Sequence, residues 1–244
     1  MPSPAINRAP TVGVFLGGTF KIDSNGNVIL DTGDKSYGTG AVYAVPLAGD
    51  WNGDGITDLG ARIYRTFFLD ANGNRRWDGV EGGDEMFQFG FTSDDPVVGD
   101  WNHDGKAEIG IFRDGMWWLD ANNDKVADAN DASFYFGMQD DQPVVGDWNG
   151  DGVDDAGVRR GINFYLDTNG NRAWNLGVDR VVAFGNVGDR AVIGDWNKDG
   201  KDDVGVYRGH AFFLDSNGNY QWDTGVDLGF ISGTDGADPL AGIW

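Results

Sequence analysis

The chain has 244 residues, of which 39 are acidic, 18 are basic and 13% are aromatic, and its formal net charge is −21. This acidity argues against nucleic acid or an anionic membrane surface as a partner, because phosphate binding requires a basic face. The absence of cysteine excludes disulfides and thiolate metal sites. No apolar run is long enough to cross a membrane, so we expect no membrane insertion.

Two motifs recur along the chain with one period. The first, Gly-Asp-Trp-Asn, has its aspartate at positions 50, 100, 147 and 195. The second, Asp-x-Asn-x-Asn/Asp, opens at positions 23, 70, 120, 167 and 215. Both markers advance by 47 to 50 residues, which predicts a structural repeat of about 48 residues.

Each repeat contains four short runs that are typical of β-strands. In the clearest copy they cover residues 96–101, 108–113, 116–120 and 133–137. These runs are rich in aromatic and β-branched residues and are bounded by Gly, Asn and Asp, and nothing between them has helical length or period. Four antiparallel strands in a unit of this length describe one blade of a β-propeller.

In chain order, we expect part of a blade at 11–38, whole blades at about 45–90, 95–137, 142–185 and 190–230, and a last strand at 239–244. The last segment resembles a first strand, and the segment from Thr11 resembles a second strand. Joining them in one blade would close the ring and hide its edges. The sequence therefore predicts an all-β, single-domain, five-bladed propeller; the alternative is a linear solenoid.

The first motif opens a loop between strands one and two, with oxygen-bearing side chains at loop positions 1, 3, 5 and 9 and glycine at position 6. This spacing is the first part of an EF-hand-type calcium loop, in which position 7 contributes its carbonyl oxygen. Ligands that are all oxygen favour Ca²⁺ over Zn²⁺. The predicted ligands are Asp50, Asn52, Asp54, Ile56, Asp58; Asp100, Asn102, Asp104, Lys106, Glu108; Asp147, Asn149, Asp151, Val153, Asp155; and Asp195, Asn197, Asp199, Lys201, Asp203.

The split blade lacks this site, because Ile243 replaces the leading aspartate.

The second motif gives a regular loop between strands three and four. Its glycine falls mostly at position 4, so we expect a different turn there. The alternatives are a second set of calcium sites or Asx-rich turns without metal. The candidate ligands are Asp23, Asn25, Asn27, Asp31; Asp70, Asn72, Asn74, Asp78; Asp120, Asn122, Asp124, Asp128; Asp167, Asn169, Asn171, Asn175; and Asp215, Asn217, Asn219, Asp223.

A further acid follows each second loop, at Asp34, Asp84, Asp131, Asp179 and Asp227. With these, the two loop sets contain 27 of the 39 carboxylates of the chain. Such crowding without a cation would cause repulsion or protonation. Nine Ca²⁺ ions would change the formal charge from −21 to about −3. We therefore expect between four and nine calcium ions.

The repeated block Pro-Val-Val-Gly-Asp-Trp-Asn-x-Asp-Gly, with Phe-Gly at the end of strand four (Phe89-Gly90, Phe136-Gly137, Phe184-Gly185), resembles FG-GAP/VCBS repeats. Those are calcium-binding blades of the kind found in the integrin α-subunit and in many bacterial surface and secreted proteins. The resemblance implies structural calcium, an extracellular or cell-surface location, and a role in adhesion or ligand binding. Five repeats instead of seven mean that integrin partners do not carry over.

No catalytic apparatus is visible in the sequence, which contains only two histidines and no nucleophile motif. Acid pairs are plentiful, so a polysaccharide hydrolase or lyase stays an alternative, although an active site normally breaks the symmetry of its repeats. We expect a monomeric binding module whose partner is a protein or a glycan. A lectin with pockets repeated between the blades is the second hypothesis.

Two repeated side chains have both functional and structural interpretations. Arginines near the end of strand two (Arg65, Arg113, Arg159, Arg208) form either a ring that grips carboxylates or sugars, or ion pairs with acids such as Asp94, Asp95, Asp140, Asp141 and Asp189. We favour the ion pairs. The motif tryptophans (Trp51, Trp101, Trp148, Trp196, Trp244) are either stacking platforms or core residues, and packing is the favoured interpretation.

Overall fold

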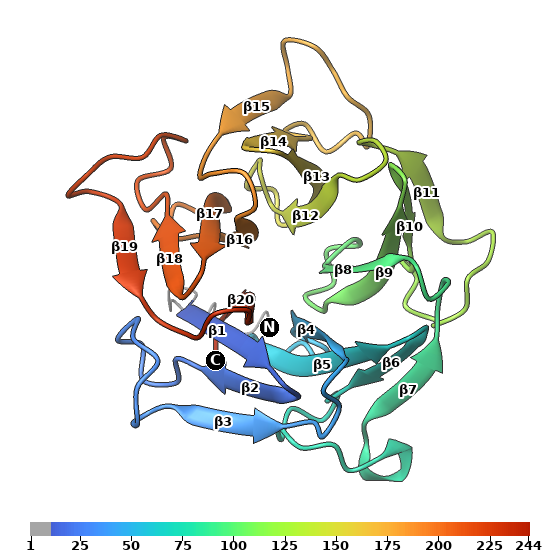
Figure 1. The fold of residues 1–244 in the computed structure, drawn as a ribbon. Helices are drawn as coiled ribbons and strands as arrows, with labels where there is room; N and C mark the ends of the chain where they lie inside the picture. Colours follow the sequence, from blue (N-terminus) through green and yellow to red (C-terminus); the bar gives the residue numbers. More distant parts are fainter. Residues whose placement is uncertain (1–10) are drawn as a thin grey trace.

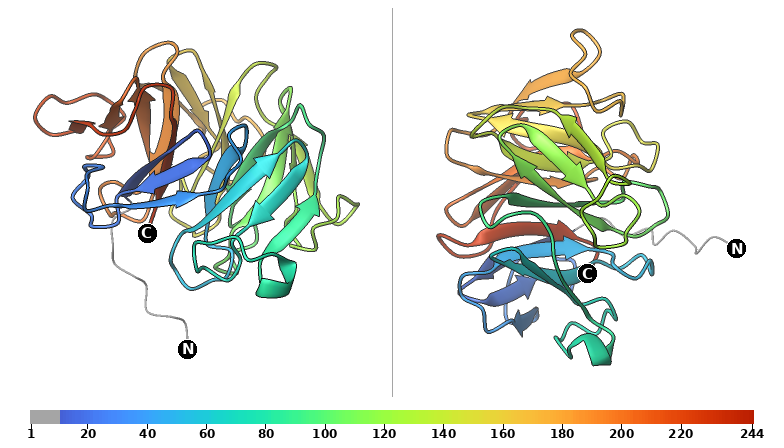
Figure 2. Two further views of the ribbon diagram at one scale, coloured as in Figure 1. Left: turned by 60° about the horizontal axis from the view of Figure 1, so that its bottom comes forward. Right: turned by 90° about the vertical axis from the view of Figure 1, so that its right-hand side faces the viewer.

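The structure is a computed structural model that describes residues 11–244 as five four-stranded antiparallel sheets around a common axis (Figure 1). The predicted five-bladed β-propeller is confirmed, and the linear solenoid is excluded. Strands run outward in order within each blade, so that β4, β8, β12, β16 and β20 lie nearest the axis (Figure 1). Side views show loops leaving both ends of the blades (Figure 2).

Blade 1 is assembled from both ends of the chain and the others are continuous. From the axis outward, blades 1 to 3 contain β20 (Asp238–Gly242), β1 (Thr11–Leu16), β2 (Thr19–Ile22), β3 (Lys35–Gly38); β4 (Val45–Gly49), β5 (Asp58–Ile63), β6 (Thr66–Leu69), β7 (Glu85–Gln88); and β8 (Asp95–Gly99), β9 (Glu108–Arg113), β10 (Met116–Leu119), β11 (Ala132–Tyr135). Blades 4 and 5 contain β12 (Gln142–Gly146), β13 (Asp155–Arg160), β14 (Asn163–Leu166), β15 (Arg180–Ala183); and β16 (Arg190–Gly194), β17 (Asp203–Arg208), β18 (Ala211–Leu214), β19 (Leu228–Ile231).

The burial of each strand follows its place in the blade. Strand two (β5, β9, β13, β17) is buried at five consecutive residues, because both of its faces are covered by neighbouring blades. Strand three alternates, as in β10, where Trp117 and Leu119 are fully buried. Gly110 in β9 lies beneath this packing, and a Cβ there would come within 2.7 Å of Leu119 Cδ2. The alternation in the sequence therefore determines which residues fill the spaces between blades.

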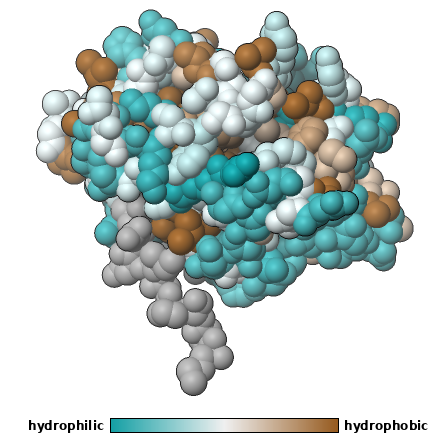
Figure 3. Space-filling view, turned by 90° about the horizontal axis from the view of Figure 1, so that it is seen from below, coloured by the Kyte–Doolittle hydropathy of each residue, from teal (hydrophilic) through white to brown (hydrophobic). Residues whose placement is uncertain are grey.

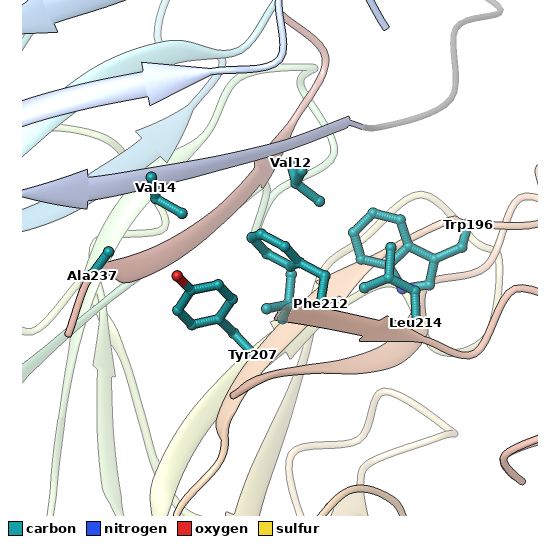
Figure 4. Close-up of a cluster of buried hydrophobic side chains, with 8 residues drawn as sticks. Val12, Val14, Trp196, Tyr207, Phe212, Leu214 and Ala237 are labelled. Carbon is teal, nitrogen blue, oxygen red and sulfur yellow. The ribbon is translucent and has the colours of Figure 1, made fainter. Parts of the chain in front are cut away.

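The ring closes by pairing β20 with β1, in a register that runs from Thr11 opposite Gly242 to Phe15 opposite Asp238. From β1, Val12 and Val14 face the side chains of Tyr207 and Phe212 in blade 5 (Figure 4). The N-terminal strand thus completes both a sheet and an interface, and the edges of both termini are hidden.

Five clusters of buried hydrophobic side chains stabilise the ring, and each lies mainly between two neighbouring blades. The cluster between blades 1 and 2, for example, combines Phe20 and Ile22 with Leu59 and Ala61. Each blade therefore has no core of its own, which is expected for a repeat that cannot bury its apolar faces alone.

The helical content of residues 11–244 is one 3₁₀ turn, Val80–Gly82. No helix in this described part has the length and apolarity needed to cross a membrane.

Candidate metal centres in two sets of loops

The loop between β4 and β5 folds around the carboxylate of Asp50. Asp50 Oδ1 accepts hydrogen bonds from the N–H groups of Gly53 (2.7 Å) and Asp54 (3.2 Å), and Oδ2 accepts one from Gly55 (2.7 Å). Asn52 Oδ1 accepts the N–H of Asp54, and Asp54 Oδ1 accepts that of Ile56. The side-chain oxygens at positions 1, 3 and 5 are thus each fixed by backbone N–H groups of the same tight turn.

The same turn recurs in the other first loops, which are the loops between strands one and two. The position-1 carboxylate accepts the N–H groups of positions 5 and 6 at Asp100, Asp147 and Asp195. At position 9 the acid opens strand two and is buried, and the asparagine of position 3 donates to it. The predicted spacing therefore describes one geometry repeated in four blades.

The second loops, between strands three and four, adopt this same turn, which corrects the expectation of a different one. Asp167 Oδ1 and Oδ2 accept the N–H groups of Asn171 (3.3 Å) and Arg172 (2.6 Å), at positions 5 and 6. The bonds from position 5 to position 3 and from position 7 to position 5 also recur, at Asn169 and Asn171. Blades 1, 3 and 5 repeat this capping at Asp23, Asp120 and Asp215.

The backbone explains why glycine was a poor guide to the turn. In both loop sets, positions 4 and 6 have positive φ, as at Gly150 (84°) and Gly152 (84°) in a first loop and Gly170 (65°) and Arg172 (64°) in a second loop. Position 6 of the second loops is occupied by Val28, Arg75, Lys125, Arg172 and Tyr220, all with φ between 62° and 65°. Side chains other than glycine are strained there, most of all the β-branched Val28.

In blades 2, 4 and 5, the glycine at position 4 of the second loop packs on the first loop of its own blade, whereas blade 3 has Asn123 at this position. A Cβ at Gly73 would lie 2.8 Å from Asn52 Nδ2 and 3.0 Å from Asp58 Oδ1. The same crowding occurs at Gly170 and Gly218, whereas Gly26 in blade 1, which lacks a first loop, has open space around it. The two loops of a blade therefore touch at one end of the sheet, as expected for candidate sites that share a face.

Position 6 of the second loop carries a long side chain because it reaches the preceding blade. The Arg75 guanidinium lies 5.7 Å from the ring centre of Tyr37, and Lys125 Nζ lies 5.4 Å from that of Phe87. Arg172 makes the equivalent contact with Phe134 at 5.7 Å. These cation–π contacts join neighbouring blades and offset the strain of the left-handed backbone.

The acid that trails each second loop closes that loop. One of its carboxylate oxygens accepts the N–H of position 9 in all five copies, from Asp31, Asp78, Asp128, Asn175 and Asp223. The other oxygen of Asp34 and of Asp227 accepts the N–H of position 2. The acid buried in every second loop is position 1, with the trailing acid also buried at Asp84, Asp179 and Asp227, whereas in the first loop the buried acid is position 9.

Burial and neighbouring carboxylates raise the pKa of every position-9 acid in the first loops. The values are about 7 for Asp58, about 8 for Glu108, about 8 for Asp155 and about 7 for Asp203. Burial is the largest cause, and acids at positions 1 and 5 of the same loop add to it. In the folded chain alone these groups retain protons well above pH 4, so a cation is a chemically suitable replacement for the proton.

Blade 3 brings its acids closest together. The carboxylate oxygens of Asp100, Asp104 and Glu108 lie within 4.8 Å of one another, and this is the only such trio among residues 11–244. Glu108 is one methylene longer than the aspartates at the same position in blades 2, 4 and 5. Three converging carboxylates with an adjacent asparagine fit a hard cation such as Ca²⁺.

Sequence reasoning missed two acids at position 8 that join adjacent first loops. Asp154 Oδ2 accepts the N–H of Asp100 at 2.7 Å, and Asp202 Oδ2 accepts that of Asp147 at 2.9 Å. Burial raises the pKa of Asp154 to about 7 and that of Asp202 well above its usual value. Position 8 is Thr57 in blade 2 and Ala107 in blade 3, so an acid at this position does not repeat around the ring. The repeat pattern therefore did not mark Asp154 and Asp202 as loop residues of interest.

The arginines form ion pairs and not an open ring. Arg113 pairs through two bonds with Asp94 (2.5 and 2.7 Å), and Arg208 pairs with Asp189 (2.7 and 2.7 Å). Strand register corrects two of the predicted positions: Arg160 replaces Arg159 and pairs with Asp141, and Ile63 replaces Arg65.

The tryptophans of the first motif are core residues. Trp51, Trp101, Trp148, Trp196 and Trp244 are all at most 8% exposed, so stacking on an external ligand is excluded for them in this structure. Those of the second loops, Trp77, Trp174 and Trp222, are 40% to 45% exposed and meet aromatic rings of strand three edge to face.

No protein-family model matches the chain, and no curated protein sequence matches it. The geometry therefore supports a β-propeller whose blades carry repeated acidic loops.

Proposed function

We propose that this protein is a calcium-stabilised β-propeller that acts as a binding module, with its repeats of the FG-GAP/VCBS type. The observation that carries the proposal is the single backbone turn shared by the first and second loops, which presents oxygens at positions 1, 3 and 5 in nine copies of the sequence pattern. The trio Asp100, Asp104 and Glu108 supports it most directly. Between four and nine ions would bind, at the first loops and at some or all of the second loops.

In this proposal calcium has a structural role. An ion that binds only the folded loops stabilises the fold by mass action and relieves repulsion among the buried acids. Position-1, position-3, position-5 and position-9 side chains would hold the ion, and the carbonyl of position 7 would complete the set. Affinities usual for extracellular calcium modules suit a millimolar environment, so we place the protein outside the cell or on its surface.

We propose binding and not catalysis as the activity. The tight turns and interlocked loops engage most of the acids of the chain in local hydrogen bonds, which supports a scaffold role for them. The partner would be a protein or a glycan recognised by a monomeric ring. A polysaccharide-acting hydrolase or lyase is the less favoured alternative.

Thermal unfolding of the EDTA-treated protein tests the proposal. Calcium at a large excess over its Kd should raise the Tm by more than about 10 °C, since several sites each contribute a few kcal/mol. Magnesium at the same concentration should do much less, because it prefers a stricter geometry and keeps its waters. A melting curve that calcium does not change, or fewer than four bound ions per chain in elemental analysis, would contradict it.

A further inference from the structure

The cavity between blades 1 and 2 differs in chemistry from the equivalent space elsewhere in the ring. Its volume is about 290 Å³, and its walls include Phe20 and Tyr37 from blade 1 and Phe68 and Trp77 from blade 2. Asp70, Arg75 and Arg76 also line it. The space between blades 3 and 4, of about 260 Å³, has Trp174 and Tyr165 at the matching places but contains no carboxylate.

The cavity exists because the repeat pattern is broken at this interface. Strand four is followed by phenylalanine at Phe89, Phe136 and Phe184, but by Thr39 at the end of blade 1 and by Ser232 at the end of blade 5. Phe136 and Phe184 lie 6.1 and 6.3 Å from the rings of Trp174 and Trp222 in the next blade, whereas Trp77 has no such neighbour. In strand two, Ala61 replaces the larger Ile111, Val158 and Val206.

Asp70 is the polar group that most requires a ligand. Its side chain is 6% exposed, and within residues 11–244 no donor meets either carboxylate oxygen in hydrogen-bonding geometry. The N–H groups of Asn74 and Arg75 lie near this carboxylate, but neither reaches it in hydrogen-bonding geometry. Its four equivalents all accept N–H groups of their own loops, as Asp167 does from Asn171 and Arg172. A buried acceptor without a donor is costly.

We propose that this cavity binds a neutral sugar ring, held against Trp77 and hydrogen-bonded to Asp70. The chemistry of the walls selects among ligands. Arg75 and Arg76 would repel a cationic ligand. Asp70 and the net charge of −21 would repel an anionic one. A sugar supplies hydroxyl donors for the carboxylate, hydroxyl acceptors for guanidinium groups, and an apolar C–H face for aromatic rings.

The size and access of the site agree with such a ligand. A cavity of about 290 Å³ is at the lower end for small-molecule sites, which suits one or two sugar rings. The Trp77 side chain is 45% exposed, so the aromatic wall is reachable from solvent. Figure 3 views the molecule from the side of blades 1 and 2, which is largely hydrophilic and has only small separate hydrophobic patches. That surface favours a small polar ligand over a broad apolar interface.

The inference goes beyond the proposed function and takes from it only the claim that the protein is a binding module. It also replaces equal pockets around the ring with one site, where the second-loop tryptophan lacks a phenylalanine partner from the preceding blade. If Asp70 contacts a sugar, the second loop of blade 2 is the loop least suited to hold calcium. The five second loops would then bind at most four ions.

The test begins with an array of neutral and acidic glycans in the presence of calcium, followed by titration of the best free glycan against tryptophan fluorescence. Trp77→Ala should weaken binding at least about tenfold, and the matched variant Trp174→Ala should change it by less than about twofold. Asp70→Asn, which keeps the shape and removes the charge, should weaken binding by about tenfold.

Thr39→Phe should fill the cavity and abolish glycan binding while the calcium-dependent rise in Tm stays. If that variant does not fold, the Trp77 and Trp174 pair decides alone. Equal losses in that pair, or no binding to any glycan by the wild-type protein, would overturn the inference. The Tm response to calcium is measured on the same samples, so failure of the sugar site and failure of the calcium proposal give different results.

Discussion

The first and second loops of a blade share one backbone turn and differ in where their constraints lie. In a first loop, position 6 is glycine and the buried acid is position 9, as in Gly152 and Asp155. In the second loop of the same blade, position 6 is Arg172, and the buried acids are Asp167 at position 1 and the trailing Asp179. Both loops cap a position-1 carboxylate in the same way, so the oxygen cluster is the common element and the remaining positions respond to neighbours.

Contacts with neighbouring loops and blades help to explain why glycine stands at position 6 in the first loops and mostly at position 4 in the second loops. First loops pack side by side around the axis, and a Cβ at Gly152 would lie 2.2 Å from Cε1 of His103 in the preceding loop. Second loops lie farther out, where position 6 faces an aromatic ring of the preceding blade and position 4 faces the first loop. At Gly152 and Gly170 the glycine leaves room for another loop, whereas position 6 of the second loops in blades 2 to 4 places a long side chain against an aromatic ring of the preceding blade.

The largest expected difference is between the position-9 acids of the two loop sets, in the pH dependence of stability without calcium. The pKa of the position-9 acids in the first loops is raised to about 7 or 8, above an unfolded value near 4. The folded chain therefore binds protons that the unfolded chain releases. Stability from these four groups is full below about pH 4 and is lost as the pH rises through 7 to 8. The Tm of EDTA-treated protein should fall between pH 5 and pH 8.

In the proposed function calcium would replace those protons, so its stabilising effect should be greater at pH 8 than at pH 5. The variant Asp155→Asn should remove part of the pH-dependent fall. Asp223→Asn at position 9 of a second loop is the matched control, because amide donors from Asn219 and Asn217 lower the pKa of Asp223. That change should leave the fall in place. Equal effects of the two variants would mean that the two loop sets do not differ in this way.

A smaller effect should come from removing one position-1 carboxylate from each loop of blade 4. Asp147→Ala and Asp167→Ala each leave backbone N–H groups without an acceptor, and each should destabilise the protein by about 2 to 4 kcal/mol in denaturant unfolding. If both loops bind calcium, each variant should also lose one ion per chain in elemental analysis. Glu81→Ala is the control and should change neither quantity, because Glu81 is an exposed acid in the second loop of blade 2 that is not a candidate ligand.

This pair decides whether the second loops are metal sites or Asx-rich turns. Loss of stability in Asp167→Ala with an unchanged ion count would assign calcium to the first loops alone. Loss of an ion in both variants would extend the proposal to the second set. In either case the capped turn itself stabilises the fold, so a neutral Asp167→Ala would contradict the structural reading.

The sequence predicted the ring and the shared spacing of the acidic loops because both depend on patterns that repeat with one period. The closure of blade 1 followed from the likeness of residues 239–244 to a first strand, and β20 pairs with β1 as expected. The sequence did not predict the turn of the second loops, because nothing in the neighbouring residues indicates a left-handed backbone at Arg172 or Val28. Their positive φ results from contacts with another blade or from closure of the loop, which propensity does not describe.

Residues that depart from the repeat pattern also limited what the sequence could predict. Arg159 and Arg160 are adjacent, and only strand register shows that Arg160 faces Asp141. In blade 2 both partners are absent, since Ile63 and Ala44 stand at the corresponding places. Similarly, the exchange of phenylalanine for Thr39 looks minor in the sequence, yet it opens the cavity beside Trp77. The effect of a residue that departs from the repeat depends on the side chains that it contacts in the neighbouring blade.

The smallest expected difference is at position 6, where each loop can be given the residue type of the other. Gly152→Ala places a Cβ at φ 84° against His103 and should destabilise the protein by about 1 to 3 kcal/mol. Arg172→Gly relieves strain of about 1 kcal/mol and loses a cation–π contact of similar size, so its net effect should lie within about 0.5 kcal/mol of zero.

The variant His103→Gly separates the two causes at Gly152. Position 4 is already glycine at Gly53 and Gly150, so this background keeps the turn and removes the clash. In the background of His103→Gly, the cost of Gly152→Ala should fall by at least half in denaturant unfolding, which leaves only the backbone strain. An unchanged cost would show that contact between neighbouring first loops does not require glycine there. A gain above about 1 kcal/mol in Arg172→Gly would show that the contact with Phe134 does not offset the strain of the second loop.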